Sequence, residues 1–223
     1  MATALIIGAS RGIGAELAKQ YVADGWRVLA TARTDADLQS LRQAGCEAFK
    51  LDVTSLTDCA GAGWHLDDEK LDLAILNAGI YGPHTSGLQA PDQQTFDRVM
   101  QTNVLAAMRL LPILLPMTDA AAGKLIAVSS VMASIEMREN SAGWLYRASK
   151  AALNSVLRDV SLQAKSSICT AIHPGWLKTD MGGAGADLGV SEGVRAIRRT
   201  IAALTPADHG QFIDAIHHQP LRW

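Results

Sequence analysis

Short β-type runs alternate with helical segments along the whole chain of 223 residues. The apolar run Thr3–Ile7 leads through glycines into a helical pattern at Gly14–Ala23, and Gly25 supplies a helix stop before a second run at Arg27–Ala32. Strands that alternate with helices in this way form a parallel sheet with helices on both faces. No linker or internal repeat divides the chain, and its length suits one domain. We therefore predict one α/β domain over residues 1–223.

The same pattern predicts the remaining elements. A helix near Asp35–Gln43 precedes a strand at Ala48–Val53, and Leu71–Leu76 is the continuous apolar run of a central parallel strand. Further along we expect a helix from a Thr95 cap to about Leu114, a strand at Lys124–Ser129, a helix at Gly143–Ala164, a strand at Ile168–His173, a helix from Ser191 to about Leu204 and a strand at Gln211–Ala215. The periodicity of Ala60–Lys70 is too weak to define helix boundaries there.

The composition favours a small-molecule partner. Hydrophobic residues make up 48% of the chain, charged residues make up 19%, and the formal net charge is −2. This balance gives no general attraction to nucleic acid or to an anionic membrane, and we predict neither partner. The most apolar stretch, Ala106–Met117, is shorter than the ~20 residues of a membrane span. It also contains Arg109 and two prolines, so we predict a buried helix.

The cysteines give no sign of a disulfide framework or a metal site. Cys46, Cys59 and Cys169 are odd in number, widely spaced and without a CxxC or Cys/His pairing. We therefore predict no metal and a reducing, cytoplasmic location. The opening segment Ala2–Ile7 lacks a basic region and is too short for a signal-peptide core, which favours a strand.

A glycine-rich loop lies between the first strand and the first helix. It reads Gly8-Ala9-Ser10-Arg11-Gly12-Ile13-Gly14. The missing side chains would let a pyrophosphate approach the free amides of the helix N-terminus. The spacing is GxxxGxG, and a tight structural turn is the alternative interpretation of the loop taken alone.

The loop resembles the TGxxxGIG cofactor loop of the short-chain dehydrogenase/reductase family, with Ile7 in place of the threonine. Three further segments match in the family's order: Asp52-Val53, Asn77-Ala78-Gly79 and Tyr146-x-x-x-Lys150. The resemblance implies a Rossmann fold with a doubly wound, mostly parallel sheet. It also implies that the glycine loop binds the cofactor, that Asp52 and Val53 contact the adenine, and that Asn77-Ala78-Gly79 stabilises the sheet beside the cofactor. For Asp52, a loop-capping role is the alternative.

The end of the second strand favours NADP(H) over NAD(H). Enzymes that prefer NAD place an acid about 20 residues after the glycine loop, where it accepts hydrogen bonds from the ribose hydroxyls. Here that stretch reads Ala30-Thr31-Ala32-Arg33, without a carboxylate. Arg11 and Arg33 would instead bind a 2′-phosphate. Each arginine alone could equally be a solvated surface residue.

Tyr146 and Lys150 are four positions apart, so on a helix both side chains lie on one face. A free tyrosine has a pKa of about 10 and burial raises it, so an acid/base tyrosine needs a cation nearby. An ammonium ~4 Å from the phenolate would stabilise it by about 4 kcal/mol at an effective dielectric of ~20. Taken alone, the spacing fits an exposed helical pair better. Beside the other matching motifs, we predict that these two residues form the catalytic centre.

The family resemblance also implies a serine at the end of the fifth strand that hydrogen-bonds the substrate carbonyl. Ser130 occupies that place, 16 positions before Tyr146, and Ser134 is the competing candidate. Asn103 matches an asparagine that in this family organises a proton path to the lysine. Pro174-Gly175 matches a PG motif, which implies that Thr179 contacts the nicotinamide carboxamide.

The stretch HPGWLKTDMGG at His173–Gly183 resembles the small branch of the family that contains C-factor and carbonyl reductases. The resemblance implies reduction of an aldehyde, ketone or quinone by NADPH, or the reverse oxidation, with Tyr146 as acid/base and Ser130 as positioning group. It also implies a homodimer or homotetramer formed through the two long helices. The rival hypothesis is a dinucleotide-binding signalling or regulatory protein of C-factor type. The substrate stays undefined.

Overall fold

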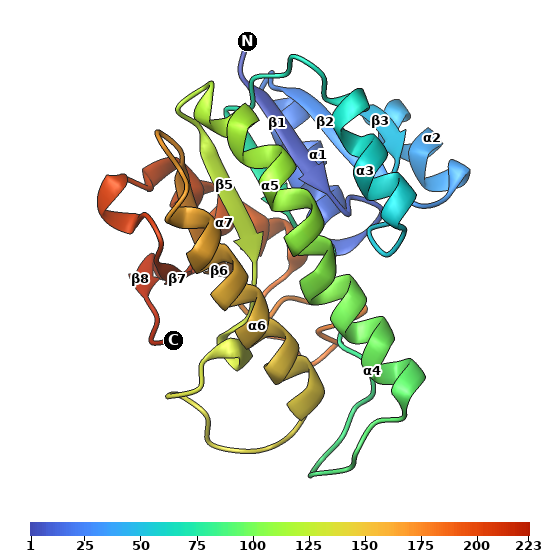
Figure 1. Cartoon of the computed structure of the whole chain (residues 1–223), viewed down its shortest axis with the longest axis vertical. Helices are drawn as coiled ribbons and strands as arrows, with labels where there is room; N and C mark the ends of the chain where they lie inside the picture. Colours follow the sequence, from blue (N-terminus) through green and yellow to red (C-terminus); the bar gives the residue numbers. More distant parts are fainter.

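The computed structural model describes all residues 1–223 and contains one eight-stranded sheet (Figure 1). The strand order is β3-β2-β1-β4-β5-β6-β7-β8, and only β8 pairs antiparallel. The strands are β1 (Thr3–Ile7), β2 (Arg27–Ala32), β3 (Glu47–Lys50), β4 (Leu73–Leu76), β5 (Lys124–Val128), β6 (Ile168–His173), β7 (Phe212–Asp214) and β8 (Gln219–Pro220). The order reverses between β1 and β4, which creates a crevice at their carboxyl ends. The predicted doubly wound α/β fold is confirmed.

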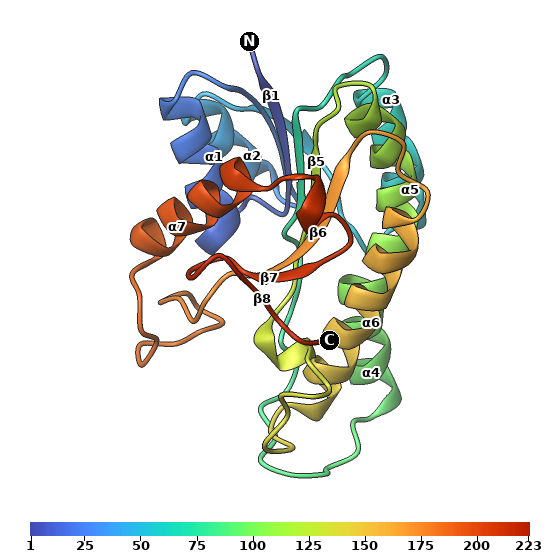
Figure 2. The ribbon, with the colours of Figure 1, turned by 90° about the vertical axis from the view of Figure 1, so that its left-hand side faces the viewer.

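Helices cover both faces of the sheet (Figure 2). The helices are α1 (Gly12–Ala23), α2 (Asp35–Gln43), α3 (Leu56–His65), α4 (Gln93–Met100), α5 (Ala106–Asp119), α6 (Trp144–Ser161) and α7 (Val190–Ala203), with a π-helical turn at Gln101–Leu105 between α4 and α5. On one face lie α1, α2 and α7, and on the other lie α3, α5 and α6. The sheet is therefore the middle of three layers.

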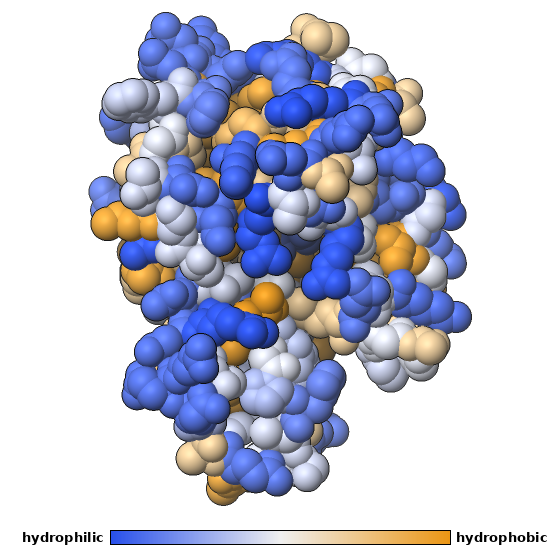
Figure 3. All heavy atoms as spheres, turned by 90° about the vertical axis from the view of Figure 1, so that its right-hand side faces the viewer, coloured by the Kyte–Doolittle hydropathy of each residue, from blue (hydrophilic) through white to orange (hydrophobic).

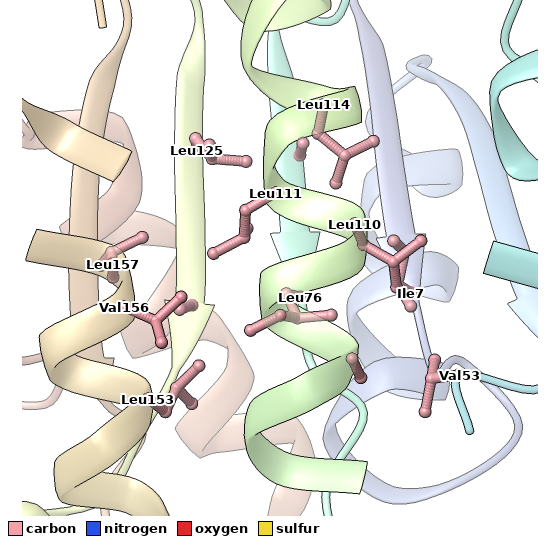
Figure 4. Close-up of a cluster of buried hydrophobic side chains, with 14 of the residues drawn as sticks. Ile7, Val53, Leu76, Leu110, Leu111, Leu114, Leu125, Leu153, Val156 and Leu157 are labelled. Carbon is pink, nitrogen blue, oxygen red and sulfur yellow. The ribbon is translucent and has the colours of Figure 1, made fainter. Parts of the chain in front are cut away.

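A separate cluster of apolar side chains is buried between the sheet and the helices on each of its two faces. Leu110, Leu111 and Leu114 of α5 are fully buried and pack with β5 and α6 side chains such as Leu125 and Leu153 (Figure 4). On the opposite face, a second cluster joins α1 and α7 to the sheet. Burial of one leucine contributes about 1.5–3 kcal/mol, so these clusters hold the strand ends in fixed positions.

The helical run Gln93–Asp119 is long and apolar enough to cross a membrane by length and composition. Its α5 part nevertheless forms the core contact described above, as predicted for Ala106–Met117. Over the face seen in Figure 3, polar side chains cover most of the surface and apolar ones form small separate patches.

Several element boundaries differ from the sequence-based expectation. The prediction that Thr95 caps a helix is wrong, because α4 begins at Gln93 and the Asp92 carboxylate accepts the Thr95 amide at 2.6 Å. Helix α3, which the periodicity could not define, begins after a Ser55 cap. Helix α6 begins at Trp144 because Gly143 has a φ of 63°, outside the helical region.

Candidate functional site

A cleft of about 450 Å³ opens at the carboxyl ends of the central strands. Most of the residues predicted to bind cofactor or substrate line this cleft: Gly8, Ser10, Arg11, Gly12, Ile13, Arg33, Asp52, Val53, Asn77, Ala78, Gly79, Tyr146, Lys150, Pro174 and Thr179. Gly14, Asn103, Ser130 and Gly175 lie outside the lining. The structure thus brings together motifs that are spread over most of the sequence.

The glycine loop is held against the residues that follow β4. Gly8 has a φ of 86°, and a Cβ there would lie 2.8 Å from the backbone of Ala78. A Cβ on Gly14 would lie 2.1 Å from the carbonyl oxygen of Gly8. That same oxygen accepts a hydrogen bond of 2.7 Å from the side-chain amide of Asn77. Glycine is therefore required at both positions for the loop to pack beside Asn77-Ala78.

The N-terminus of α1 faces the cleft without a side-chain cap. The helix begins at Gly12, Arg11 makes no capping hydrogen bond, and no acidic residue lies in the first turn. The first amides of a helix have no partner within it, and its dipole favours an anion at this end. The residues present thus fit the pyrophosphate of a dinucleotide.

Asp52 lies after β3 and lines the cleft where the adenine is expected. Its carboxylate accepts hydrogen bonds from the amide and hydroxyl of Thr54, at 2.9 and 2.7 Å. The loop-capping contact considered as an alternative for Asp52 is therefore present, alongside its position in the cleft lining.

The two arginines predicted to bind a 2′-phosphate differ in their contacts. Arg33 follows β2, is exposed and forms no ion pair. Arg11 lines the same cleft, but its guanidinium pairs with the carboxylate of Asp180.

The Tyr146 side chain is 6% exposed and belongs to the first half of α6. Burial raises the pKa of its phenol to about 12, and a hydrogen bond with Ser130 acts in the opposite direction. The ring stacks on Tyr81, with centroids 4.6 Å apart and planes inclined by 25°. At neutral pH this phenol holds its proton.

Lys150 lies one helical turn after Tyr146 and is 3% exposed. Its Nζ donates a hydrogen bond of 2.8 Å to the carbonyl oxygen of Val128 and lies 5.8 Å from the centroid of the Tyr146 ring. Burial lowers the pKa of this ammonium to about 8. No hydrogen bond joins the two side chains.

The two candidate serines occupy different environments. The Ser130 hydroxyl neighbours the Tyr146 phenol and accepts a 3.2 Å hydrogen bond from the amide of Met132. The Ser134 hydroxyl instead donates to the carbonyl oxygen of Trp223 at 3.3 Å and accepts the Met137 amide at 3.0 Å.

Asn103 lies in the π-helical turn between α4 and α5 and is 2% exposed. Its side-chain oxygen accepts the amide of Ile80, and its nitrogen donates to the carbonyl of Ile80, both at 2.8 Å. The nitrogen also donates to the Ser149 hydroxyl at 2.9 Å. A π-helical turn widens the helix and is frequent at functional sites. Here the turn joins the loop after β4 to α6.

The PG motif forms the turn that follows β6. Gly175 has a φ of 85°, and a Cβ there would lie 2.6 Å from Ile216. Beyond the turn, the Thr179 hydroxyl accepts the Gly182 amide at 3.0 Å. Thr179 reaches the glycine loop, since a Cβ on Gly12 would lie 3.4 Å from its methyl group.

Several contacts of the site were not predicted from the sequence. Thr31 of β2 accepts the Gly8 amide through its hydroxyl at 3.0 Å and so supports the glycine loop. Tyr81 covers the ring of Tyr146, and Asp180 pairs with Arg11. Each of these contacts joins residues far apart in sequence or depends on ring orientation, so no local motif could have revealed them.

A model of the short chain dehydrogenase family matches residues 2–187. The chain belongs to this family. The C-signal protein of Myxococcus xanthus is 34% identical over 147 residues, which cover 65% of this chain and 88% of that protein. Two similar solved structures each match this chain over its full length and over their own full length, 100% in both directions. The carbonyl reductase Sniffer of D. melanogaster has a TM-score of 0.90 at 27% identity, and a carbonyl reductase from Pseudomonas aeruginosa PAO1 in complex with NADP has 0.85 at 33% identity.

Membership of the family makes the chain an oxidoreductase that uses a nicotinamide dinucleotide. The cleft described above has the features that this chemistry needs: a glycine loop, an uncapped helix N-terminus and a buried tyrosine–lysine pair.

Proposed function

We propose that the protein is an NADP(H)-dependent oxidoreductase that reduces the carbonyl group of an aldehyde, ketone or quinone, or oxidises the corresponding alcohol. The observation that carries the proposal is the position of the buried Tyr146 phenol, which neighbours Ser130, has the Lys150 Nζ 5.8 Å from its ring centroid, and lines the same cleft as the glycine loop. A proton donor and a dinucleotide cradle then share one cleft.

The cofactor would be held from both ends of the cleft. The glycine loop and the α1 N-terminus bind the pyrophosphate, and Asp52 with Val53 contacts the adenine. Asn77-Ala78-Gly79 stabilises the sheet beside the cofactor, Pro174 and Gly175 shape the turn after β6, and Thr179 contacts the nicotinamide carboxamide. When bound, the nicotinamide supplies the hydride.

The protein's own residues manage the proton. Tyr146 keeps its proton on the phenol oxygen at neutral pH and donates it to the substrate oxygen, while Ser130 hydrogen-bonds and positions that oxygen. The Lys150 ammonium adds positive charge beside the phenol ring, which favours the phenolate left after proton transfer. Asn103 positions the loop and helix around the lysine through Ile80 and Ser149.

We attribute the preference for NADP(H) to Arg33 and Arg11. Arg33 has no competing carboxylate, and no acid occupies the end of β2. The NADP-bound carbonyl reductase from Pseudomonas aeruginosa supports the same choice. In Arg33→Ala we expect NADPH to bind at least tenfold more weakly and NADH binding to stay unchanged, in line with the loss of a charge-assisted phosphate contact. Equal catalytic efficiency with both cofactors would contradict the assignment.

The direct test of the activity is a screen of aldehydes, ketones and quinones while the absorbance of NADPH is followed. We expect consumption of NADPH with at least one carbonyl class. Tight NADPH binding without consumption of NADPH by any of them would reject the enzyme proposal in favour of the second candidate function.

That second candidate is a dinucleotide-binding signalling protein, and the similarity to C-signal favours it. Such a protein would need only the glycine loop and the adenine site. The present chain also keeps Tyr146 and Lys150 in the cleft lining with Ser130 beside Tyr146, which a binding protein does not require. We therefore favour the enzyme.

We further propose a homodimer or homotetramer that forms through the α4–α5 and α6 faces, where Met108 and Leu162 are exposed. Cys46, Cys59 and Cys169 are free and buried, which fits a reducing cytoplasm.

A further inference from the structure

One ion pair crosses the cofactor cleft. The Arg11 guanidinium on the glycine loop pairs with the Asp180 carboxylate, which lies in the segment after β6. The two side chains are separated by 169 positions in sequence and are 71% and 74% exposed. Both residues line the cleft. The pair is therefore reachable by any anion that enters the cleft from solvent.

Hydrogen bonds within the segment after β6 hold Asp180 in this position. The segment is closed at its base by a bridge between Leu177 and Leu188, with the Lys178 amide donating to the Leu188 carbonyl at 2.9 Å. The Trp176 indole donates to the carbonyl of Gly182 at 2.9 Å, which fixes the turn around Asp180. Asp180 is thus presented to the glycine loop by a folded loop.

The pair places a carboxylate on one of the two cations proposed to receive the 2′-phosphate. A phosphate monoester carries a charge of about −1.5 to −2 at pH 7 and is bound by arginine through two parallel hydrogen bonds. A single carboxylate carries less charge, and an exposed ion pair is weak. The phosphate can therefore displace Asp180 from Arg11.

We propose that Asp180 is a cofactor-specificity residue that competes with the 2′-phosphate of NADP(H) for the Arg11 guanidinium. This inference rests on the proposed role of Arg11 in binding that phosphate. Asp180 lowers the affinity for NADP(H), leaves the affinity for NAD(H) unchanged, and neutralises Arg11 while the cofactor is absent. The selectivity that Arg33 and Arg11 provide together is therefore smaller than the two charges alone would give.

The test compares dissociation constants of NADPH and NADH, measured by calorimetry, for the full chain and for Asp180→Asn, Arg11→Gln and the double variant. Asp187→Asn is the matched control, because Asp187 is exposed in the same loop and forms no ion pair. In Asp180→Asn we expect NADPH to bind about two- to fivefold more tightly, the range that an exposed ion pair allows. NADH binding should not change, and Asp187→Asn should leave both constants unchanged.

In the Arg11→Gln background, the gain from Asp180→Asn should disappear. Weaker NADPH binding in Asp180→Asn would overturn the inference, since Asp180 would then orient Arg11 for the phosphate. An equal gain in Asp187→Asn would also overturn it, by showing a general charge effect. If Arg11→Gln leaves NADPH binding unchanged, the role of Arg11 in the proposed function fails. If Arg11→Gln weakens binding and Asp180→Asn has no effect, the competition alone fails.

Discussion

The Nζ of Lys150 donates a 2.8 Å hydrogen bond to the carbonyl oxygen of Val128, the last residue of β5. This bond ties α6, which carries the tyrosine, to the strand end that precedes Ser130. The lysine therefore fixes the relative position of the two groups proposed to meet the substrate oxygen. It does so from a buried site, where a charge is costly.

Removal of the Lys150 charge should raise the free energy of unfolding and abolish the enzyme's turnover. Burial lowers the pKa of Lys150 from 10.5 to about 8. Below about pH 8 the folded protein therefore carries a buried ammonium that is more stable in the unfolded chain, and this lowers the free energy of unfolding. The loss disappears as the pH rises to 10.5, where the unfolded chain also releases the proton. In Lys150→Met we expect about 1–3 kcal/mol more stability near pH 7, with a turnover loss.

The pH dependence of denaturant unfolding checks this prediction. The stability gain of Lys150→Met should shrink steadily between pH 8 and 10.5, the window set by the two pKa values. Lys19→Met removes an exposed ammonium and should show no such trend. A gain of Lys150→Met that is the same at all pH values would contradict the account.

Ser130 and Ser134 should separate into one catalytic and one structural residue. Ser130→Ala should lower kcat/KM by about 10²-fold, because it removes a hydrogen bond to the reacting oxygen. Ser134→Ala loses its contacts with Trp223 and Met137, which should cost about 0.5–1.5 kcal/mol and leave kcat/KM close to wild type. Carbonyl reduction that survives in Ser130→Ala and fails in Ser134→Ala would reverse the assignment.

Asn103→Leu should damage stability and turnover together. The substitution leaves the part-buried backbone groups of Ile80 and the buried hydroxyl of Ser149 without their partner, at a cost of about 1–3 kcal/mol for a group left fully unsatisfied. The matched control is Gln101→Leu, which changes an exposed residue of the same π-helical turn. Chemical unfolding and steady-state kinetics of both variants provide the measurement; equal behaviour of the two would refute the positioning role.

Gly14→Ala tests whether the glycine loop must be packed as observed. The added methyl group would lie 2.1 Å from the Gly8 carbonyl oxygen and 2.6 Å from the side-chain amide nitrogen of Asn77. We expect a loss of about 1–3 kcal/mol in stability, and NADPH binding weakened at least tenfold because the loop has to shift. Gly61→Ala, in α3 with open space around it, should instead gain about 0.5–1 kcal/mol. Thermal unfolding distinguishes the two.

The fold was largely predictable because most strands are continuous apolar runs, which can be recognised from the local sequence. The bounds of β1, β2, β6 and α2 agree with the expected ranges. The Thr95 error lies where a neighbouring residue competes for the same role. Asp92 and Thr95 are both good caps, and only the structure shows which one accepts the amide.

Site residues could be predicted from the sequence where they belong to one local motif. Contacts between segments far apart in sequence could not. The lysine and tyrosine share one helix, so their spacing placed both in the cleft. The spacing could not show that Lys150 bonds to Val128, because that contact depends on how α6 packs against β5. The Asp180 partner of Arg11 was hidden for the same reason, since the fold alone brings the two loops together.

The central claim is that Tyr146 transfers the proton, and Tyr146→Phe tests it most directly. The measurement is the single-turnover rate of NADPH oxidation with a carbonyl substrate, alongside the Kd of NADPH. We predict that NADPH still binds while the rate falls by about 10²- to 10⁴-fold, the usual contribution of a general acid. A rate close to that of the wild type, with NADPH bound, would contradict the mechanism.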